Sequence, residues 1–438
     1  MNFVPGKRGT LIGLAVVFAA AGLLLFNSFY GIGTPDEAFY PILPFRFLRG
    51  ARPFIDEWHV SQLSAFLQYP FVKLFVGLTG SADGIILYFR ALFILVQLAF
   101  SCLVFLRMKK NGFACALTGT LLFELFAAEC TLSLDYYTLS LFAILAVWLV
   151  LFSPKKPGAA NFVFAGAFFA CAVLAEPPFV IVYVFWFAAV VVSAALRKRP
   201  HPALALKPFA LITAGIAAVA AVFFAWLFMR MTPSEFLANF FNVFRSGEYS
   251  VHTLGVGYGN YAQSLLRDFS WTAGAAAVYI AAIIIDRGRG RRRLMWTYAG
   301  LTIFAVMMLM TVIGSVKNSN LLSFISPPFA VAFMGLAAYI LSENRKKELL
   351  VLWIFGLGYT VTVAVGSESM IYAGSYGFVF SDIASVPMIF GLCEELSVRR
   401  RDKKRRRGGS FARSNPSRDA FRPVPVCAAV LLVCVLGI

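Results

Sequence analysis

The chain is built from long apolar runs that are separated by short clusters of basic residues. A run of about 20 apolar residues is what a helix needs to cross the hydrocarbon core of a bilayer. Mean hydropathy is +0.78 and only 14% of residues are charged. The composition therefore predicts an all-α fold, a polytopic transmembrane helical bundle of about 12–13 spans. The expected spans are 11–30, 84–106, 112–128, 136–152, 160–175, 178–196, 209–229, 270–286, 295–314, 321–341, 348–365 and 377–396.

The charge pattern predicts an orientation. A net charge of +18 would suit a nucleic-acid-binding protein, but most of the 39 lysines and arginines lie in alternate loops between spans. Basic loops stay on the cytoplasmic side of a membrane. We therefore expect a cytoplasmic amino terminus, acidic loops outside, and a multi-pass protein of a bacterial plasma membrane, with membrane lipids as partners and no nucleic acid.

Domain limits follow from the same pattern. Residues 1–396 are expected to form the membrane domain, in which 31–83 is the first outer loop. Residues 397–423 are expected to form a basic cytoplasmic segment. The last apolar run, 424–438, is shorter than a full span, so it is a partial span or the start of a truncated one.

The first outer loop carries two acidic pairs, Asp36-Glu37 and Asp56-Glu57. The letters TPDE at 34–37 have the form of a capping box, which predicts a short helix with Asp36 in its first turn. Two prolines at 41 and 44 are expected to break or kink that helix, and a second interfacial helix is expected over 60–76. Capping and solvation alone would also explain the acidic pairs.

The order of residues in this loop resembles a known family. An apolar first span, then D-E-x-x-Y, then G-x-x-P-F-x-D is similar to the C-type integral-membrane glycosyltransferases, in the branch of protein mannosyltransferases and aminoarabinose transferases. The matching positions are Asp36, Glu37, Tyr40, Gly50, Pro53, Phe54 and Asp56. Arg90, Asp135 and Lys317 match charged positions later in the family pattern. Glu176 departs from it, because relatives often carry a lysine there.

The resemblance implies a glycosyltransferase that moves a sugar from a polyprenyl-phosphate carrier to a glycan, lipid or protein acceptor outside. The catalytic candidates are Asp36, as the general base, and Glu37. A cation should stabilise the leaving phosphate, with Lys317 the first choice and Arg245 the second. The other substrate-binding candidates are Tyr40, Asp56, His59, Arg90 and Asp135.

The sequence identifies no definite cofactor, and a divalent metal is a candidate. His59 and His252 could join Glu37 or Asp56 at such a metal. A lone surface histidine is more often simply solvated. The spacing of the cysteines shows no CxxC pattern, which leaves no thiolate zinc site to consider.

Two other classes of function stay open. A lipid or oligosaccharide transporter should show matching broken helices in its two halves and charge within its spans. Here the charge lies mainly in the outer loops, and Glu124, which does lie within a span, is expected to pair with a polar neighbour. A surface-polysaccharide polymerase or ligase would also act outside on lipid-linked sugars, but it usually relies on a large late outer loop.

Overall fold

The structure of the protein is a computed structural model. It describes residues 6–30, 36–59, 62–126, 132–152, 156–195, 206–245, 274, 277–282, 284–285, 322–366 and 375–407. Within these ranges the chain is helical, apart from loops and one isolated bridge between Pro53 and Glu57. The all-α prediction is confirmed.

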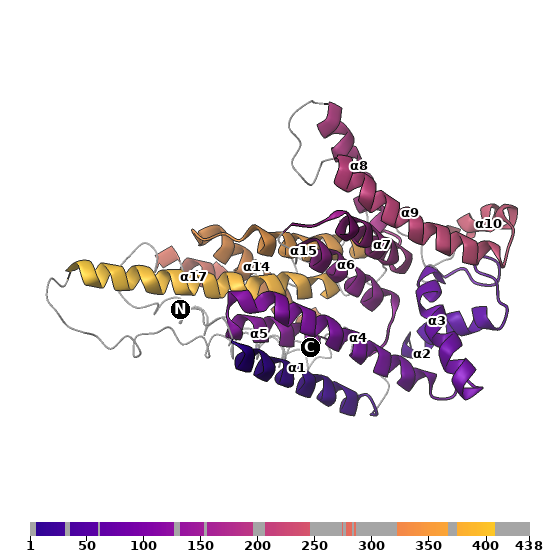
Figure 1. The fold of residues 1–438 in the computed structure, drawn as a ribbon, viewed down its shortest axis with the longest axis horizontal. Helices are drawn as coiled ribbons and strands as arrows, with labels where there is room; N and C mark the ends of the chain where they lie inside the picture. The colour runs from indigo at the N-terminus through magenta and orange to yellow at the C-terminus, as the bar shows by residue number, and fades with distance from the viewer. Residues whose placement is uncertain are drawn as a thin grey trace.

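The helices follow the apolar runs (Figure 1). They are α1 (Lys7–Asn27), α2 (Asp36–Leu48), α3 (Gln62–Thr79), α4 (Ile85–Met108), η1 (Lys109–Asn111), α5 (Phe113–Glu124), α6 (Tyr136–Phe152), α7 (Ala159–Ala175), α8 (Phe179–Ala195), α9 (Leu206–Phe228), α10 (Pro233–Asn239), η4 (Phe240–Arg245), α14 (Leu322–Leu341), α15 (Lys347–Gly366), η5 (Ser375–Gly377) and α17 (Phe378–Arg407). Most predicted spans that the structure describes agree with one of these helices to within a few residues. The expected span 295–314 lies outside the described residues.

Four stretches in the described part are long and apolar enough to cross a membrane: Lys7–Asn27, Ile85–Asn111, Leu206–Phe228 and Lys347–Ala364. Five shorter apolar helices accompany them. Together they indicate a membrane protein. The prediction of 12–13 spans stays a prediction.

Most helices run along the long axis of the molecule (Figure 1). Helix α4 packs on α1 and α5, and α17 packs on α5, α14 and α15. Their contacts form one large core that includes Phe93, Phe105, Trp148 and Phe380. Helix α8 and the start of α9 project away from this bundle, where the rings of Tyr183 and Phe209 stack at 5.8 Å.

Helices α7 and α9 are held together by two glycines. A Cβ atom at Gly166 would overlap the carbonyl oxygen of Ile212, and one at Gly215 would overlap that of Val163. The two backbones therefore approach more closely than any larger residue allows, which is the small-residue packing typical of membrane helices.

The two ends of the bundle differ in chemistry. At one end, Arg107 and Lys110 both bind Glu348, and the Lys346 ammonium donates to the Asn111 amide oxygen at 2.7 Å. These residues belong to loops that the charge pattern assigns to the cytoplasm. At the other end lie α2, α3 and α10 (Figure 1). Loops predicted to share a side are therefore found together.

The structure refines three details of the sequence prediction. The two prolines do not break α2, which continues through Pro41 and Pro44 as far as Leu48. It does so because Leu43 and Phe47 are buried in a cluster with Trp226 of α9, and this packing supports the helix despite the lost backbone hydrogen bonds. Helix α1 begins before its apolar run, at Lys7. Helix α17 continues beyond 396 through the basic residues to Arg407, since arginine and lysine are good helix formers.

Candidate functional site

A buried ion pair fixes the start of α2. The Nε and Nη2 atoms of Arg90 donate to the two carboxylate oxygens of Glu37, each at 2.6 Å. Only 4% of Arg90 and 1% of Glu37 are exposed. Arg90 also donates to the backbone carbonyl of Ser28, so one guanidinium joins the end of α1, the start of α2 and the start of α4.

Two more carboxylates are buried where the following helices begin or end. Asp135 precedes α6 and accepts a hydrogen bond from the Thr138 backbone N–H at 2.6 Å, as a helix cap does. Glu176 follows α7 and is 4% exposed. Burial, and then the charge of Asp135, raise the pKa of the Glu176 carboxyl well above its usual value. The neutral form of Glu176 is therefore favoured.

Tyrosine rings connect these helices. Tyr40 of α2 contacts Tyr136 at 5.5 Å between ring centroids, and Tyr137 contacts Tyr376 at 4.8 Å. The Tyr359 hydroxyl donates to the Tyr137 carbonyl at 3.0 Å. Tyrosine combines an apolar ring with a polar tip, so such a cluster can support a polar ligand at the edge of a membrane.

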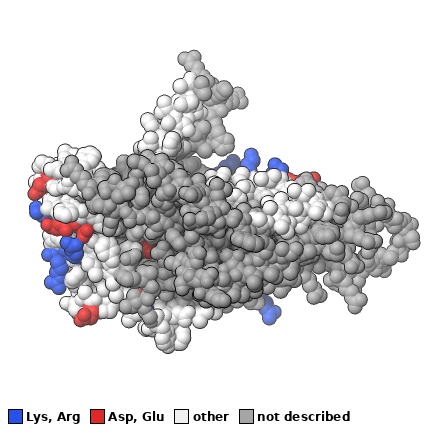
Figure 2. Space-filling model, turned by 180° about the vertical axis from the view of Figure 1, so that it is seen from behind, with Lys and Arg blue, Asp and Glu red and all other residues white. Residues whose placement is uncertain are grey.

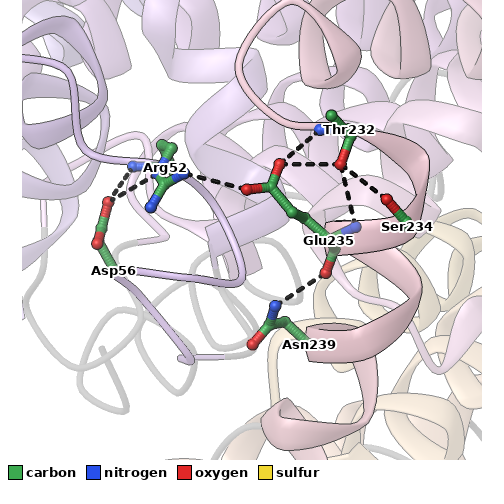
Figure 3. A network of polar contacts seen from close by, with 6 residues as sticks. All are labelled: Arg52, Asp56, Thr232, Ser234, Glu235 and Asn239. Carbon is green, nitrogen blue, oxygen red and sulfur yellow. Dashed lines mark hydrogen bonds and ion pairs between the residues drawn. The ribbon is translucent and has the colours of Figure 1, made fainter.

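A second, exposed network ties the loop between α2 and α3 to α10 (Figure 3). Arg52 lies 3.7 Å from Asp56 and 3.4 Å from Glu235. Thr232 and Glu235 form a capping box, in which each side chain accepts a hydrogen bond from the other residue's backbone N–H. The hydrogen bonds from Thr232, more than the charge of Arg52, lower the pKa of the Glu235 carboxyl.

The loop itself is anchored by Phe54. This residue has a φ of 63°, which is uncommon for a side chain of its size. Its backbone N–H donates to the Gln62 amide oxygen at 2.8 Å, and its ring contacts Phe236 at 5.1 Å. These contacts offset the energetic cost of the strained backbone and hold the α2–α3 loop on α10.

The predicted site residues therefore fall into two groups. Glu37, Tyr40, Arg90 and Asp135 are buried at the joints between helices, while Asp56 and His59 lie on the loop between α2 and α3. Asp36 is the first residue of α2, and its side chain lies outside the described part.

The side chains of the two predicted phosphate-binding residues lie outside the part of the chain that the structure describes. Arg245 is the last residue of η4, and Lys317 lies outside the described ranges, as does His252. The metal hypothesis gains no geometric support, since no three histidine, cysteine or acidic residues of the described part form a group that could hold a metal ion.

Arg230 is a candidate that the sequence did not single out. Its guanidinium carbon lies 4.3 Å from the centre of the Trp226 ring and 5.0 Å from that of Tyr69. No carboxylate of the described part pairs with it. A half-buried arginine that follows an apolar helix and faces aromatic rings is suited to an anion at the membrane interface. The position of Arg230 directly after the predicted span 209–229 is the sequence feature that could have identified it.

Charged side chains mark this end of the molecule on its surface. Figure 2 shows acidic and basic residues next to one another at the end formed by α2, α3 and α10, with uncharged surface beside them.

Comparisons of the chain with protein-family models, curated proteins and solved structures gave no match.

Proposed function

We propose that the protein is an integral-membrane glycosyltransferase that moves a sugar from a polyprenyl-phosphate carrier to an acceptor on the outer face of the plasma membrane. The observation that carries this proposal is the buried Glu37–Arg90 pair. It ties the first turn of α2 to α1 and α4, at the end of the bundle that carries the other acidic loops. A reacting group on α2 would thus have a rigid support.

In the proposed reaction, Asp36 is the general base. Its carboxylate takes the proton from the acceptor hydroxyl, whose oxygen then forms a bond to the anomeric carbon. The bond between that carbon and the carrier phosphate breaks, and the phosphate leaves with the electron pair. Asp36 is in the first turn of α2, where the helix dipole favours an ionised carboxylate.

The leaving phosphate needs a cation. Lys317 and Arg245 remain the candidates from the sequence, and the structure adds Arg230. The aromatic cluster of Trp226, Phe223 and Phe66 beside it offers apolar contacts to a polyprenyl chain. The exposed apolar side chains Phe224 and Phe228 of α9 would face lipid, the direction from which such a donor arrives.

The decisive experiment assays the purified protein with polyprenyl-phosphate sugars and with nucleotide sugars. We expect turnover with the lipid-linked donor and a loss of about 10²–10⁴-fold in rate for Asp36→Asn, because that change removes the base but keeps the size of the side chain. The exposed substitution Ser234→Ala is the matched control and should retain full activity. Turnover with nucleotide sugars alone, or an Asp36→Asn protein above about a tenth of the wild-type rate, would contradict the proposal.

One observation favours a second function, a lipid or oligosaccharide transporter. Glu124 of α5 and Asp382 of α17 are buried within apolar helices, and the described part offers neither Glu124 oxygen nor Asp382 Oδ1 a hydrogen-bond partner. Charged groups inside a membrane often line the path of a substrate or ion. Movement of a labelled lipid-linked sugar across proteoliposomes without any acceptor would support transport over transfer.

A further inference from the structure

A cluster of polar side chains lies between α4 and α5, away from the proposed site. Gln97 and Ser101 of α4 contact the end of α5 and Glu124, and Thr120 lies one turn before Glu124 on α5. At most 3% of each of these residues is exposed. In each helix the two residues are four positions apart, so they share one face. Gln97 is seven residues from Arg90, which places the cluster roughly 10 Å deeper along α4.

Four oxygen atoms of this cluster have no hydrogen-bond partner in the described part of the chain. They are both carboxylate oxygens of Glu124 and the hydroxyl oxygens of Ser101 and Thr120. The Ser101 side chain faces the Glu124 carboxylate. Ser101 is thus the polar neighbour expected for Glu124, although neither Glu124 oxygen makes a hydrogen bond of ordinary geometry with it.

Other buried hydroxyls in the bundle behave differently. Thr360 and Ser385 each donate to the carbonyl four residues earlier, at 3.0 and 2.7 Å. This local bond is the usual way for a helical serine or threonine to be satisfied in an apolar environment. Ser101 and Thr120 do not make this bond, so their hydroxyl oxygens are left able to bind a ligand.

The geometry points to a binding site for a single sodium ion. We propose that Glu124, Ser101 and Thr120 coordinate it. A buried carboxylate must be neutralised, and no lysine or arginine of the described part pairs with this one. Oxygen ligands suit hard cations, and one carboxylate matches one positive charge, whereas a divalent ion would require more acidic ligands.

Gln97 positions the two helices and is not itself a proposed ligand. Its side-chain N–H groups lie 2.9, 2.6 and 3.0 Å from the carbonyl oxygens of Phe123, Glu124 and Phe126, at the end of α5. These bonds satisfy the last turn of α5 and fix the depth at which Glu124 meets Ser101. The site is thus held by two packed helices, and it does not depend on the proposed sugar transfer.

The test measures thermal unfolding of the purified full chain in lipid nanodiscs, in sodium chloride and in choline chloride at matched ionic strength. A ligand that binds only the folded protein raises its unfolding temperature in a saturable way. We expect sodium to do so for the wild type and for Thr362→Val, a control in which a back-bonded hydroxyl on α15 is removed. We expect no sodium response from Glu124→Gln.

Two milder variants keep the proposal testable if Glu124→Gln does not fold. Ser101→Ala and Thr120→Val each remove one ligand, and each should lower the apparent sodium affinity by about tenfold or more. Equal unfolding temperatures in the two salts would overturn the proposal. So would a stability that follows pH and not sodium, which would assign a proton to Glu124, with Cys102 on α4 as the titratable group that interacts with it.

Discussion

At the scale of single residues, the Glu37–Arg90 pair carries the largest energetic consequence. Removing one member of a buried pair leaves the other charge unpaired in an apolar environment, which costs about 3–5 kcal/mol. From the sequence alone, Glu37 is either a catalytic candidate or a cap of α2, and a lost cap costs only about 0.5–2 kcal/mol. The structure therefore changes the expected effect of substituting Glu37 from mild to severe.

We predict that Glu37→Gln and Arg90→Met each destabilise the protein by about 3–5 kcal/mol. The double variant should lose less than the two single losses combined, because it leaves no buried charge behind. Unfolding in detergent by denaturant provides the measurement, and the exposed substitution Lys73→Ala on α3, expected to change stability by less than about 0.5 kcal/mol, is the control. Strictly additive losses would show that the pair does not act as a unit.

Glu235 provides a prediction about pH. The pKa of the Glu235 carboxyl in the folded protein lies below its usual value. Its ionised form therefore stabilises the fold at pH values above the unfolded pKa, and this stabilisation is lost as the pH falls through the folded pKa. Carbon NMR of labelled glutamates should show that Thr232→Val raises this pKa more than Arg52→Ala does, because the hydrogen bonds of Thr232 outweigh the charge of Arg52. The reverse order would mean that the ion pair in Figure 3 dominates.

At the scale of elements, the close approach of α7 and α9 depends on glycine. We predict that Gly166→Ala destabilises the protein, because the added methyl group overlaps the Ile212 carbonyl and the two backbones must separate. A matched control is Gly358→Ala on α15, where nothing lies within 4 Å of the added carbon. That change should be neutral or stabilising by about 0.5–1 kcal/mol, since alanine is the better helix former. Equal effects at both positions would exclude close packing as the reason for Gly166.

The positions of the elements could be predicted because apolar length determines where a membrane helix forms. The limits of α6 and α7 illustrate this, since both fall within a residue of the expected span. The continuation of α2 through Pro41 and Pro44 could not be predicted, because it depends on contacts with α9, which lies far away in the sequence.

The candidate site could be predicted only in part, for the same reason. Local patterns proposed Asp36, Glu37 and Asp135 as candidates, whereas the pairing of Glu37 with Arg90 is known only from the structure. The buried Glu176 and the aromatic surroundings of Arg230 result from helix packing. Packing between distant helices has no signal in a single sequence.

At the scale of the whole molecule, the separation of charge between the two ends predicts which end faces the cytoplasm. Arg107, Lys110 and Lys346 lie at one end, and the acidic first outer loop lies at the other. Basic loops are retained inside, because translocating them is unfavourable. We therefore expect the loop between α2 and α3 outside and the basic end of α17 inside.

Cysteine labelling in intact cells tests this orientation. On a cysteine-free background, we predict that an impermeant thiol reagent labels Asp56→Cys, whose parent side chain is 44% exposed, and does not label Lys404→Cys until the membrane is permeabilised. Unfolded protein should be labelled at both positions, which confirms that each cysteine is reactive. Labelling of position 404 but not of position 56 in intact cells would show that the protein has the opposite orientation in the membrane. The proposed transfer would then face the cytoplasm, where nucleotide sugars are the common donors, and its outward-facing mechanism would have to be abandoned.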